Sequence, residues 1–441
     1  MSEYYQGASN KGIMYALGFF TMYYCLYDFT TAHSVIPTTI SNSIVLLSIL
    51  FVLLLLCIKT NIHIISKSSI PWIPFILVVV ANCFTNDNMA KSYMLLYIIF
   101  LFMVANPYIN SVSFDGLIKW IKVMGVVAIV GIVIQMFVPS VYNTLIHYIF
   151  SSEGVNYVNT YAGRGYYSGL FHQVGDAAFY VSASIIAFVY LSDYKYKKYV
   201  LIALFIGLFL LSKRSLVFAL VFSVLVTFLI TGSNVTTKIG RGVIVLLLAI
   251  VFVYLLRILS GIFIDIKFFE KMAYSLDFLS EGDVDGILLQ SGRLDLYDYA
   301  KLLFHENFLT GIGWGEFIEK SSMVDPGGHN TSVHNIYLQL LCETGVIGFG
   351  SFVFGAACSL VSSIKAKKMI ENFYGNEKDL YYSLFKVSFS GQLLFLLFGF
   401  VENPLYNENN LLFYFLMIFI NYVLIENMKR RRRVQQIIHN Q

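Results

Sequence analysis

The chain has 441 residues, of which 57% are hydrophobic and only 13% are charged, and its formal net charge is +4. Soluble proteins carry about a quarter of charged residues, so this composition excludes an ordinary soluble enzyme. The basic residues lie in short segments between apolar runs, so the positive charge does not indicate nucleic-acid binding, and no nucleic-acid partner is expected.

Apolar runs of about 20 residues recur along the chain, which is the length that crosses a bilayer as a helix. Backbone groups in lipid must bond within their own segment, so these runs predict helices rather than open sheets. We predict an all-α polytopic protein of the lipid bilayer, with about 12 transmembrane helices. The expected spans are 12–31, 40–58, 70–86, 90–106, 116–138, 171–192, 198–212, 214–232, 242–262, 334–363, 380–400 and 409–426.

Positively charged loops remain in the cytoplasm, which sets the direction of the spans. With both termini inside, 20 of the 30 Lys and Arg residues fall on the cytoplasmic side and nine fall outside. This orientation places two large loops outside. The predicted divisions are N-terminal transmembrane helices at 1–138, an outer loop at 139–170, central transmembrane helices at 171–262, a large outer loop at 263–333, C-terminal transmembrane helices at 334–426 and a basic cytoplasmic tail at 427–441.

The sequence lacks the motifs by which several classes of enzyme bind metals, nucleotides or substrates. The five cysteines fall in or beside apolar runs without CxxC spacing, which is typical of small core residues. The acidic run from Glu281 resembles a calcium loop, but Gly292 stands where a bidentate Glu is needed. No HExxH, P-loop or G-x-S-x-G pattern is present. We therefore expect neither a metal nor a cofactor.

His334 is the first candidate for chemistry, because it stands with Asn335 at the start of the tenth helical segment, just after the large polar loop. The positive end of a helix dipole favours a neutral imidazole, which is the form that accepts a proton. The alternative is that His334 only caps the helix or lies in the interface. His329, which also precedes an asparagine, is a rival for the same role.

Arginines on the predicted outer side form the second candidate group. Arg164 and Arg293 depart from the positive-inside pattern, and a guanidinium suits a bidentate diphosphate better than an ammonium does. Each could instead pair with a loop carboxylate, as Arg293 could with Asp295 or Asp298. Lys213 and Arg214, at the tip of a predicted hairpin, could equally be anchors that reach the interface.

Two motifs in order resemble the O-antigen polymerase and O-antigen ligase superfamily of bacterial inner-membrane glycosyltransferases. Residues 307–317 are similar to the family's pLtGiGxGxF segment, and residues 334–348 to its HNxxLxxLxExGxxG segment. Arg293 matches the family's loop arginine. The stretch 164–171 resembles an earlier R-x-x-G-x-f segment, and 212–215 a degraded S-x-S-R.

This resemblance implies an undecaprenyl-diphosphate-linked oligosaccharide as donor, used on the periplasmic face of the bacterial inner membrane. It further implies that Arg164 and Arg293, with Arg214 as a third, hold the diphosphate while His334 takes a proton from the attacking hydroxyl. Asn335 and Glu343 are secondary candidates. The expected reaction is metal-independent and inverts the anomeric carbon, because the hydroxyl displaces the diphosphate directly.

Three activities remain open. We favour an O-antigen polymerase, which moves the growing glycan onto another lipid-linked repeat unit, because the Tyr- and Phe-rich outer loops suit a particular repeat unit. An O-antigen ligase would transfer the glycan to lipid A-core. A flippase should show mid-membrane charges and symmetric halves, and the sequence shows few such charges and no internal repeat. A chain-length regulator would be a further protein partner, although no residue points to it.

Overall fold

The computed structural model describes residues 69–85, 111–150, 152–191, 194–232, 235–281, 292–324, 331–374 and 377–439. In these ranges all regular secondary structure is helical. The predicted spans 12–31, 40–58 and 90–106 lie outside the described residues.

The described helices follow the predicted apolar runs closely. The helices that coincide with these runs are α3 (Ile73–Thr85), α5 (Ser111–Phe137), α8 (Val174–Leu191), α9 (Lys197–Leu210), α10 (Arg214–Ile230), α11 (Val235–Ile262), α16 (Ile336–Glu371), α17 (Lys378–Phe398) and α18 (Glu408–His439). By length and composition, α5, α8, α11, α16 and α17 can each cross a membrane, and Ile70–Asn82 and α10 are shorter apolar helices. The chain is therefore a polytopic helical membrane protein, with five candidate spans among the described residues.

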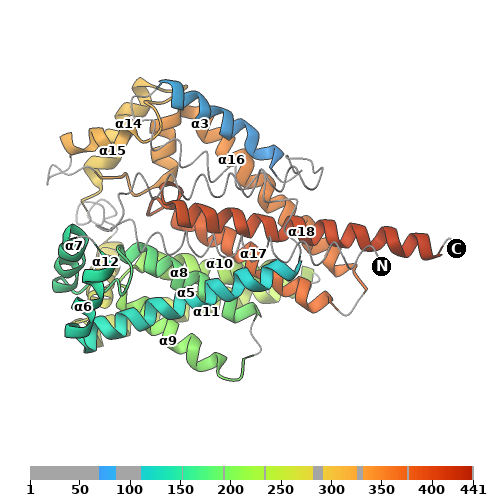
Figure 1. Cartoon of the computed structure of the whole chain (residues 1–441), viewed down its shortest axis with the longest axis horizontal. Helices are drawn as coiled ribbons and strands as arrows, with labels where there is room; N and C mark the ends of the chain where they lie inside the picture. The colour runs from blue at the N-terminus through green and yellow to red at the C-terminus, as the bar shows by residue number, and fades with distance from the viewer. Residues whose placement is uncertain are drawn as a thin grey trace.

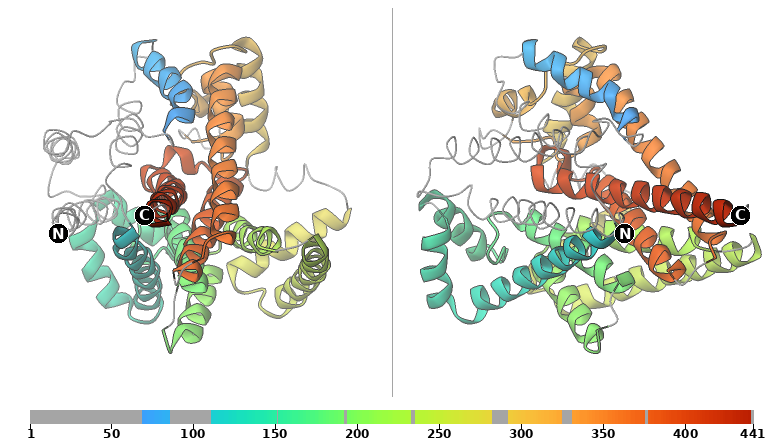
Figure 2. Two further views of the ribbon diagram at one scale, coloured as in Figure 1. Left: turned by 90° about the vertical axis from the view of Figure 1, so that its right-hand side faces the viewer. Right: turned by 45° about the vertical axis from the view of Figure 1, so that its right-hand side comes forward.

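Helices α17 and α18 lie side by side through the middle of the molecule (Figure 1). On one side α16 packs against both of them and carries α3 and α14. On the other side α8 and α10 pack on α17, and α5 and α9 pack on α8. The two further views in Figure 2 show the same order, with α18 between these groups. Tyr414 of α18 stacks on Phe395 of α17 at 4.4 Å between ring centroids, and Trp72 packs edge-on against Tyr414, so aromatic rings fill the centre.

The two segments predicted as outer loops contain helices of their own. Residues 139–170 include α6 (Pro139–Ile149) and α7 (Ser152–Gly163), and residues 263–333 include α12 (Lys267–Glu281), α14 (Leu294–Glu306), α15 (Glu316–Lys320) and a 3-10 turn, η3 (Ser321–Met323). Helices α6, α7 and α12 gather at one end of the molecule (Figure 1). The polar residues that the sequence places in loops are thus held on short helices.

Helix α16 is broken at Gly345, which has φ 61° and ψ −169°. The break leaves backbone groups without helical partners, and the glycine-rich segment before α15 supplies them. Ile312 N donates to Cys342 O at 3.0 Å and Gly313 N to Glu343 O at 2.9 Å, while Val346 N donates to Phe308 O at 3.0 Å. The two sequence motifs therefore bind each other through their backbones.

Glycine is required at both sides of this crossing. A Cβ on Gly345 would lie 2.2 Å from Leu309 O, and a Cβ on Gly311 would lie 2.3 Å from the carbonyl carbon of Glu343. Gly311 also has a positive φ of 72°, which L side chains adopt rarely. The crossing sets the angle at which the first turns of α16, and His334 before them, meet the rest of the bundle.

Candidate functional site

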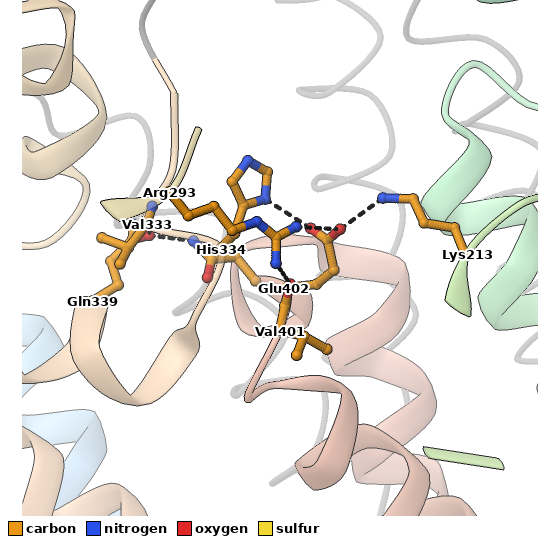
Figure 3. A network of polar contacts seen from close by, with 8 residues as sticks. Lys213, Arg293, Val333, His334, Gln339, Val401 and Glu402 are labelled. Atoms are coloured by element: carbon orange, nitrogen blue, oxygen red, sulfur yellow. Dashed lines mark hydrogen bonds and ion pairs between the residues drawn. The ribbon is translucent and has the colours of Figure 1, made fainter. Parts of the chain in front are cut away.

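The carboxylate of Glu402, in the segment between α17 and α18, is the centre of a polar network (Figure 3). Its Oε1 atom lies 2.6 Å from Lys213 Nζ and 3.4 Å from Arg293 Nη2. Its Oε2 atom lies 2.8 Å from His334 Nδ1. Three cationic or titratable side chains from distant parts of the chain thus share one carboxylate.

Each of these side chains stands at the end of a helix. Lys213 immediately precedes α10, Arg293 precedes α14, and Glu402 follows α17. The backbone is tied as well, because Arg293 Nη1 donates to Val401 O at 2.8 Å. Ile336 N likewise donates to Gly399 O at 2.8 Å. The side chains of the network are therefore attached at rigid helix ends, which fix their positions better than a mobile loop would.

Opposite charges keep Glu402 ionised although it is withdrawn from solvent. Burial by itself would raise the pKa of Glu402, but the charge of Lys213, followed by His334 and then Arg293, holds that pKa well below its ordinary value. Its side chain is 14% exposed, whereas that of His334 is 32% exposed. The network therefore presents an accessible imidazole against a carboxylate whose pKa is lowered.

His334 precedes the N-cap of α16, whereas the sequence predicted it in the first turn of this helix. Asn335 is the N-cap of α16, and its side chain accepts hydrogen bonds from Tyr337 N at 3.0 Å and Leu338 N at 3.1 Å. His334 precedes the cap with a positive φ of 58°. The secondary candidate Asn335 thus serves the helix start, while the carboxylate of Glu402, rather than the helix dipole, engages the His334 ring. The rival His329 lies outside the described residues.

A carboxylate at Nδ1 selects one tautomer of His334. When Glu402 accepts the proton of Nδ1–H, the other ring nitrogen, Nε2, carries a lone pair and can accept a proton from a substrate hydroxyl. The same pairing stabilises the imidazolium that forms when the proton is taken up. A histidine placed in this way can act as a general base, with the carboxylate as its orienting group.

Arg214 and Lys271 extend the positive charge beyond Glu402. Arg214 Nη1 donates to the backbone carbonyl of Lys271 and to the hydroxyl of Ser275, both on α12. The Lys271 ammonium lies over the ring of Tyr166, 4.3 Å from its centroid. Burial, and next the charge of Arg214, lower the pKa of Lys271 to about 8. An anion bound beside Lys271 would stabilise its charged form.

The predicted arginines are brought together in part. Arg293 reaches Glu402 directly, so its partner is neither Asp295 nor Asp298. Arg214 directly follows Lys213 in the chain and binds Lys271 and Ser275 of α12. Arg164 is exposed, with its guanidinium 5.9 Å from the Tyr161 ring centroid, and no contact joins it to Glu402. Its neighbour Gly165 faces α12 (a Cβ there would lie 3.6 Å from Lys267 Cβ), so Arg164 stands at the margin of the positive region.

Glu343, the other secondary candidate, holds the local structure together through hydrogen bonds. Its buried carboxylate accepts hydrogen bonds from Gly315 N at 2.8 Å and Phe317 N at 3.2 Å. The Gln339 amide at 2.9 Å and the Tyr406 hydroxyl also donate to it. All of these partners are protein groups, so Glu343 closes the turn between the glycine segment and α15.

Sequence reasoning missed Glu402 and the segment 401–410 around it. Asn403 donates to the Gln339 side chain, Tyr406 to Glu343, and Asn407 to Asp176 at 2.8 Å, so this segment contacts most elements of the site. The signal in the sequence is a dense run of Glu and Asn residues between two apolar spans. Polar side chains at the end of a membrane helix mark a functional position.

No group of three or more His, Cys, Asp or Glu side chains in the described ranges could hold a metal ion. The cations of the network are instead lysine and arginine, which bind phosphate oxygens directly. The arrangement can therefore bind an anionic group and accept a proton beside it.

Apolar helices with a charged network at their ends define a polytopic membrane protein that carries a polar site at one end of its bundle. Residues 199–353 match the family model described as O-Antigen ligase. This stretch is therefore similar to the O-antigen polymerase and ligase superfamily, whose function is glycan transfer, and the resemblance seen in the sequence is confirmed for residues 199–353. A search of the curated proteins found no match. The matched stretch contains Arg214, Arg293 and His334, but neither Arg164 nor Glu402.

Proposed function

We propose that this protein is a surface-polysaccharide polymerase that transfers a glycan from a lipid diphosphate to a sugar hydroxyl of another lipid-linked repeat unit. The observation that carries the proposal is the junction of Lys213, Arg293 and His334 on Glu402, beside Arg214 and Lys271. A diphosphate leaving group needs fixed positive charge, and the attacking hydroxyl needs a base. In this network the positive charges and the candidate base are adjacent.

Cations outnumber the carboxylates that pair with them in the described part of the network. Among the described residues, these carboxylates are Glu402 and Glu270, and Glu270 lies 2.7 Å from Lys267. The cations that influence one another there are Lys213, Arg214, Lys267, Lys271 and Arg293. In the described ranges, five cations thus accompany two carboxylates, which supports binding of a diphosphate here. Arg214 and Arg293 are the bidentate ligands we propose for it, and Arg164 reaches it from the margin.

The proposed chemical step is a direct displacement. The acceptor oxygen bonds to the anomeric carbon while its proton passes to Nε2 of His334. The bond between the anomeric carbon and the phosphate oxygen breaks, and the diphosphate departs with the bonding electrons. Attack from the side opposite the leaving group inverts the anomeric centre. The guanidinium groups neutralise the charge that develops on the leaving oxygen, so the step needs no metal ion.

Basic residues also gather at the end of the bundle opposite the network, which supports an outward-facing site. Helices α8, α10 and α16 begin at the network, and their far ends meet basic residues that bind backbone or carboxylate oxygens. These contacts are Lys122 and Lys197 at the end of α8, Arg241 at the end of α10, and Lys367 and Lys378 near the end of α16. Positive residues accumulate on the cytoplasmic side. We therefore propose that the network faces the periplasm of the inner membrane and that both termini are cytoplasmic.

The ligase is the second candidate, because it needs the same donor chemistry and differs only in acceptor. A deletion strain separates the three activities. A polymerase mutant makes lipopolysaccharide with a single repeat on its core, a ligase mutant accumulates lipid-linked polymer, and a flippase mutant traps single repeats on the cytoplasmic leaflet.

The direct test of the proposed site is His334→Ala, with His305→Ala as a matched control from the exposed end of α14. Both variants should reach the membrane in normal amounts. The His334 variant should lose polymer, because a general base contributes about 10²–10⁴ in rate, and the control should retain it. Normal chains from the His334 variant would remove this residue as the base.

A further inference from the structure

A row of aromatic rings lies on the 139–172 segment, beside the cationic network. Its members are half-buried and are contributed by α7 and by the turn that follows it: Tyr157, Tyr161, Tyr166 and His172. Consecutive ring centroids along this aromatic row are 4.4 to 6.1 Å apart. The separations are 4.8 Å for His172 to Tyr157, 4.4 Å for Tyr157 to Tyr161, and 6.1 Å for Tyr161 to Tyr166.

The local sequence explains how the row forms. Tyr157 and Tyr161 are four residues apart on α7, so they share a face of that helix. The chain then turns at Gly165, with a positive φ of 82°, and returns His172 to the same face. His172 stacks on Tyr157 with an interplanar angle of 16°. Neither His172 nor these tyrosines has a part in the glycan-transfer step proposed above.

One end of the row meets the proposed diphosphate ligands. The Tyr166 ring lies 4.3 Å from the Lys271 ammonium, and the Lys271 carbonyl accepts a hydrogen bond from Arg214. Gly175, which follows His172 closely in the chain, faces Lys213, since a Cβ there would lie 3.7 Å from Lys213 Nζ. The row therefore runs along the border of the positive region.

The charges of the network also act on the middle of the row. Burial, and next the Tyr161 hydroxyl, raise the pKa of Tyr157. The charges of Asp176 and Glu402 raise that pKa further. A molecule that contacts these rings would thus be within reach of the reacting groups.

We infer that the aromatic row binds the sugars that directly follow the diphosphate in the donor. The inference rests on the proposed function and adds a subsite to it. The faces of sugar rings present C–H bonds with partial positive charge, and these are attracted to the negative face of an aromatic ring. The first sugar is bonded to the diphosphate itself, so it must lie against the ring closest to the phosphate ligands, which is Tyr166. The acceptor sugar approaches from the His334 side.

Two binding measurements on the purified full chain in nanodiscs test the inference. The probes are geranylgeranyl diphosphate, which has the diphosphate and no sugar, and lipid-linked repeat unit extracted from the cells that produce this protein. Tyr161→Ala and Tyr166→Ala should each weaken binding of the lipid-linked glycan by roughly three- to tenfold. Both should leave binding of geranylgeranyl diphosphate unchanged.

Matched variants separate the ring from the hydroxyl and from the general fold. Tyr161→Phe and Tyr166→Phe should retain most of the affinity for the glycan, because the ring face remains. Tyr148→Ala, at a side chain of the same segment that is 80% exposed, should bind both probes as wild type does.

The outcomes distinguish this inference from the proposed function. Equal losses for both probes in the Ala variants, or no loss for the glycan, would overturn the aromatic subsite while the diphosphate site stands. If wild-type protein binds neither probe, the proposed donor itself is wrong. Preferential loss of the glycan in the Ala variants alone supports the subsite.

Discussion

His334 Nδ1 lies 2.8 Å from Glu402 Oε2, although 68 residues separate the two positions in the chain. The pair joins the segment before α16 to the segment after α17, and the other oxygen of the same carboxylate holds Lys213 and Arg293. Glu402 therefore has two tasks in the proposed reaction. It orients the imidazole, and it holds two cations at the place where the diphosphate binds.

Glu402→Gln separates these tasks. An amide Nε2 placed at His334 would donate to Nδ1, so the ring would carry its proton on Nε2 and could no longer act as a base. We expect polymer formation to fall about 10²- to 10⁴-fold, measured as the initial rate of chain growth in isolated membranes. Glu402→Asp retains the charge and should lose less. A normal rate for the Gln variant would show that Glu402 does not orient the imidazole and that its role is limited to the ion pairs.

The left-handed backbone of His334 predicts a trade between stability and activity. Its φ of 58° is costly for any residue with a Cβ, by about 1–2 kcal/mol relative to glycine. His334→Gly and His334→Ala both remove the imidazole, but only glycine relieves the backbone.

The glycine variant should therefore unfold at a higher temperature than the alanine variant, by a few degrees, while both lose polymer formation. Thermal unfolding of the detergent-purified proteins measures the difference. Equal unfolding temperatures would show that the backbone at this position is not strained.

Several parts of the site could be predicted from the sequence because they rest on local signals. The apolar runs predict α5, α8, α11, α16 and α17 from their length alone, and the HN pair before an apolar run marks the start of α16. Arg293 and His334 were expected to meet, and one carboxylate joins them.

Other parts depend on contacts between distant segments, which a single sequence does not encode in a pattern. The pairing of Glu402 with His334 requires the start of α16 and the end of α17 to lie at the same level, and the helix lengths set that level only after packing. The role of Gly345 is similar. The backbone segment that binds the break, residues 308–313, is visible only in the folded chain.

Lys271 predicts a pH dependence of donor binding. Its pKa is lowered from an ordinary value of 10.5 to about 8, first by burial and then by Arg214. The folded protein thus releases this proton at lower pH than the unfolded chain does. Between pH 8 and 10.5 the lysine favours the folded state increasingly as pH rises. Over the same range it loses its positive charge and no longer attracts the diphosphate.

Affinity for geranylgeranyl diphosphate should accordingly fall by about three- to tenfold between pH 7 and pH 9. Lys271→Arg keeps its charge over this range, so its binding curve should be flatter. The comparison is made by titration at constant ionic strength, since screening also weakens phosphate binding. Parallel curves for the two proteins would assign the dependence to another group.

Gly345→Ala should destroy the crossing between the two sequence motifs without touching the charged network. The new Cβ would lie 2.2 Å from Leu309 O, and the residue would have to keep a φ of 61°. The clash and the strained backbone together should destabilise the protein by at least about 3 kcal/mol, so little protein should reach the membrane. Gly350→Ala on the same helix is the control, because a Cβ there meets no atom within 4 Å, and alanine should slightly favour the helix. Quantitative immunoblots of membrane fractions measure both. Normal amounts of the Gly345 variant would mean that α16 can straighten and that residues 308–313 have no part in holding its break.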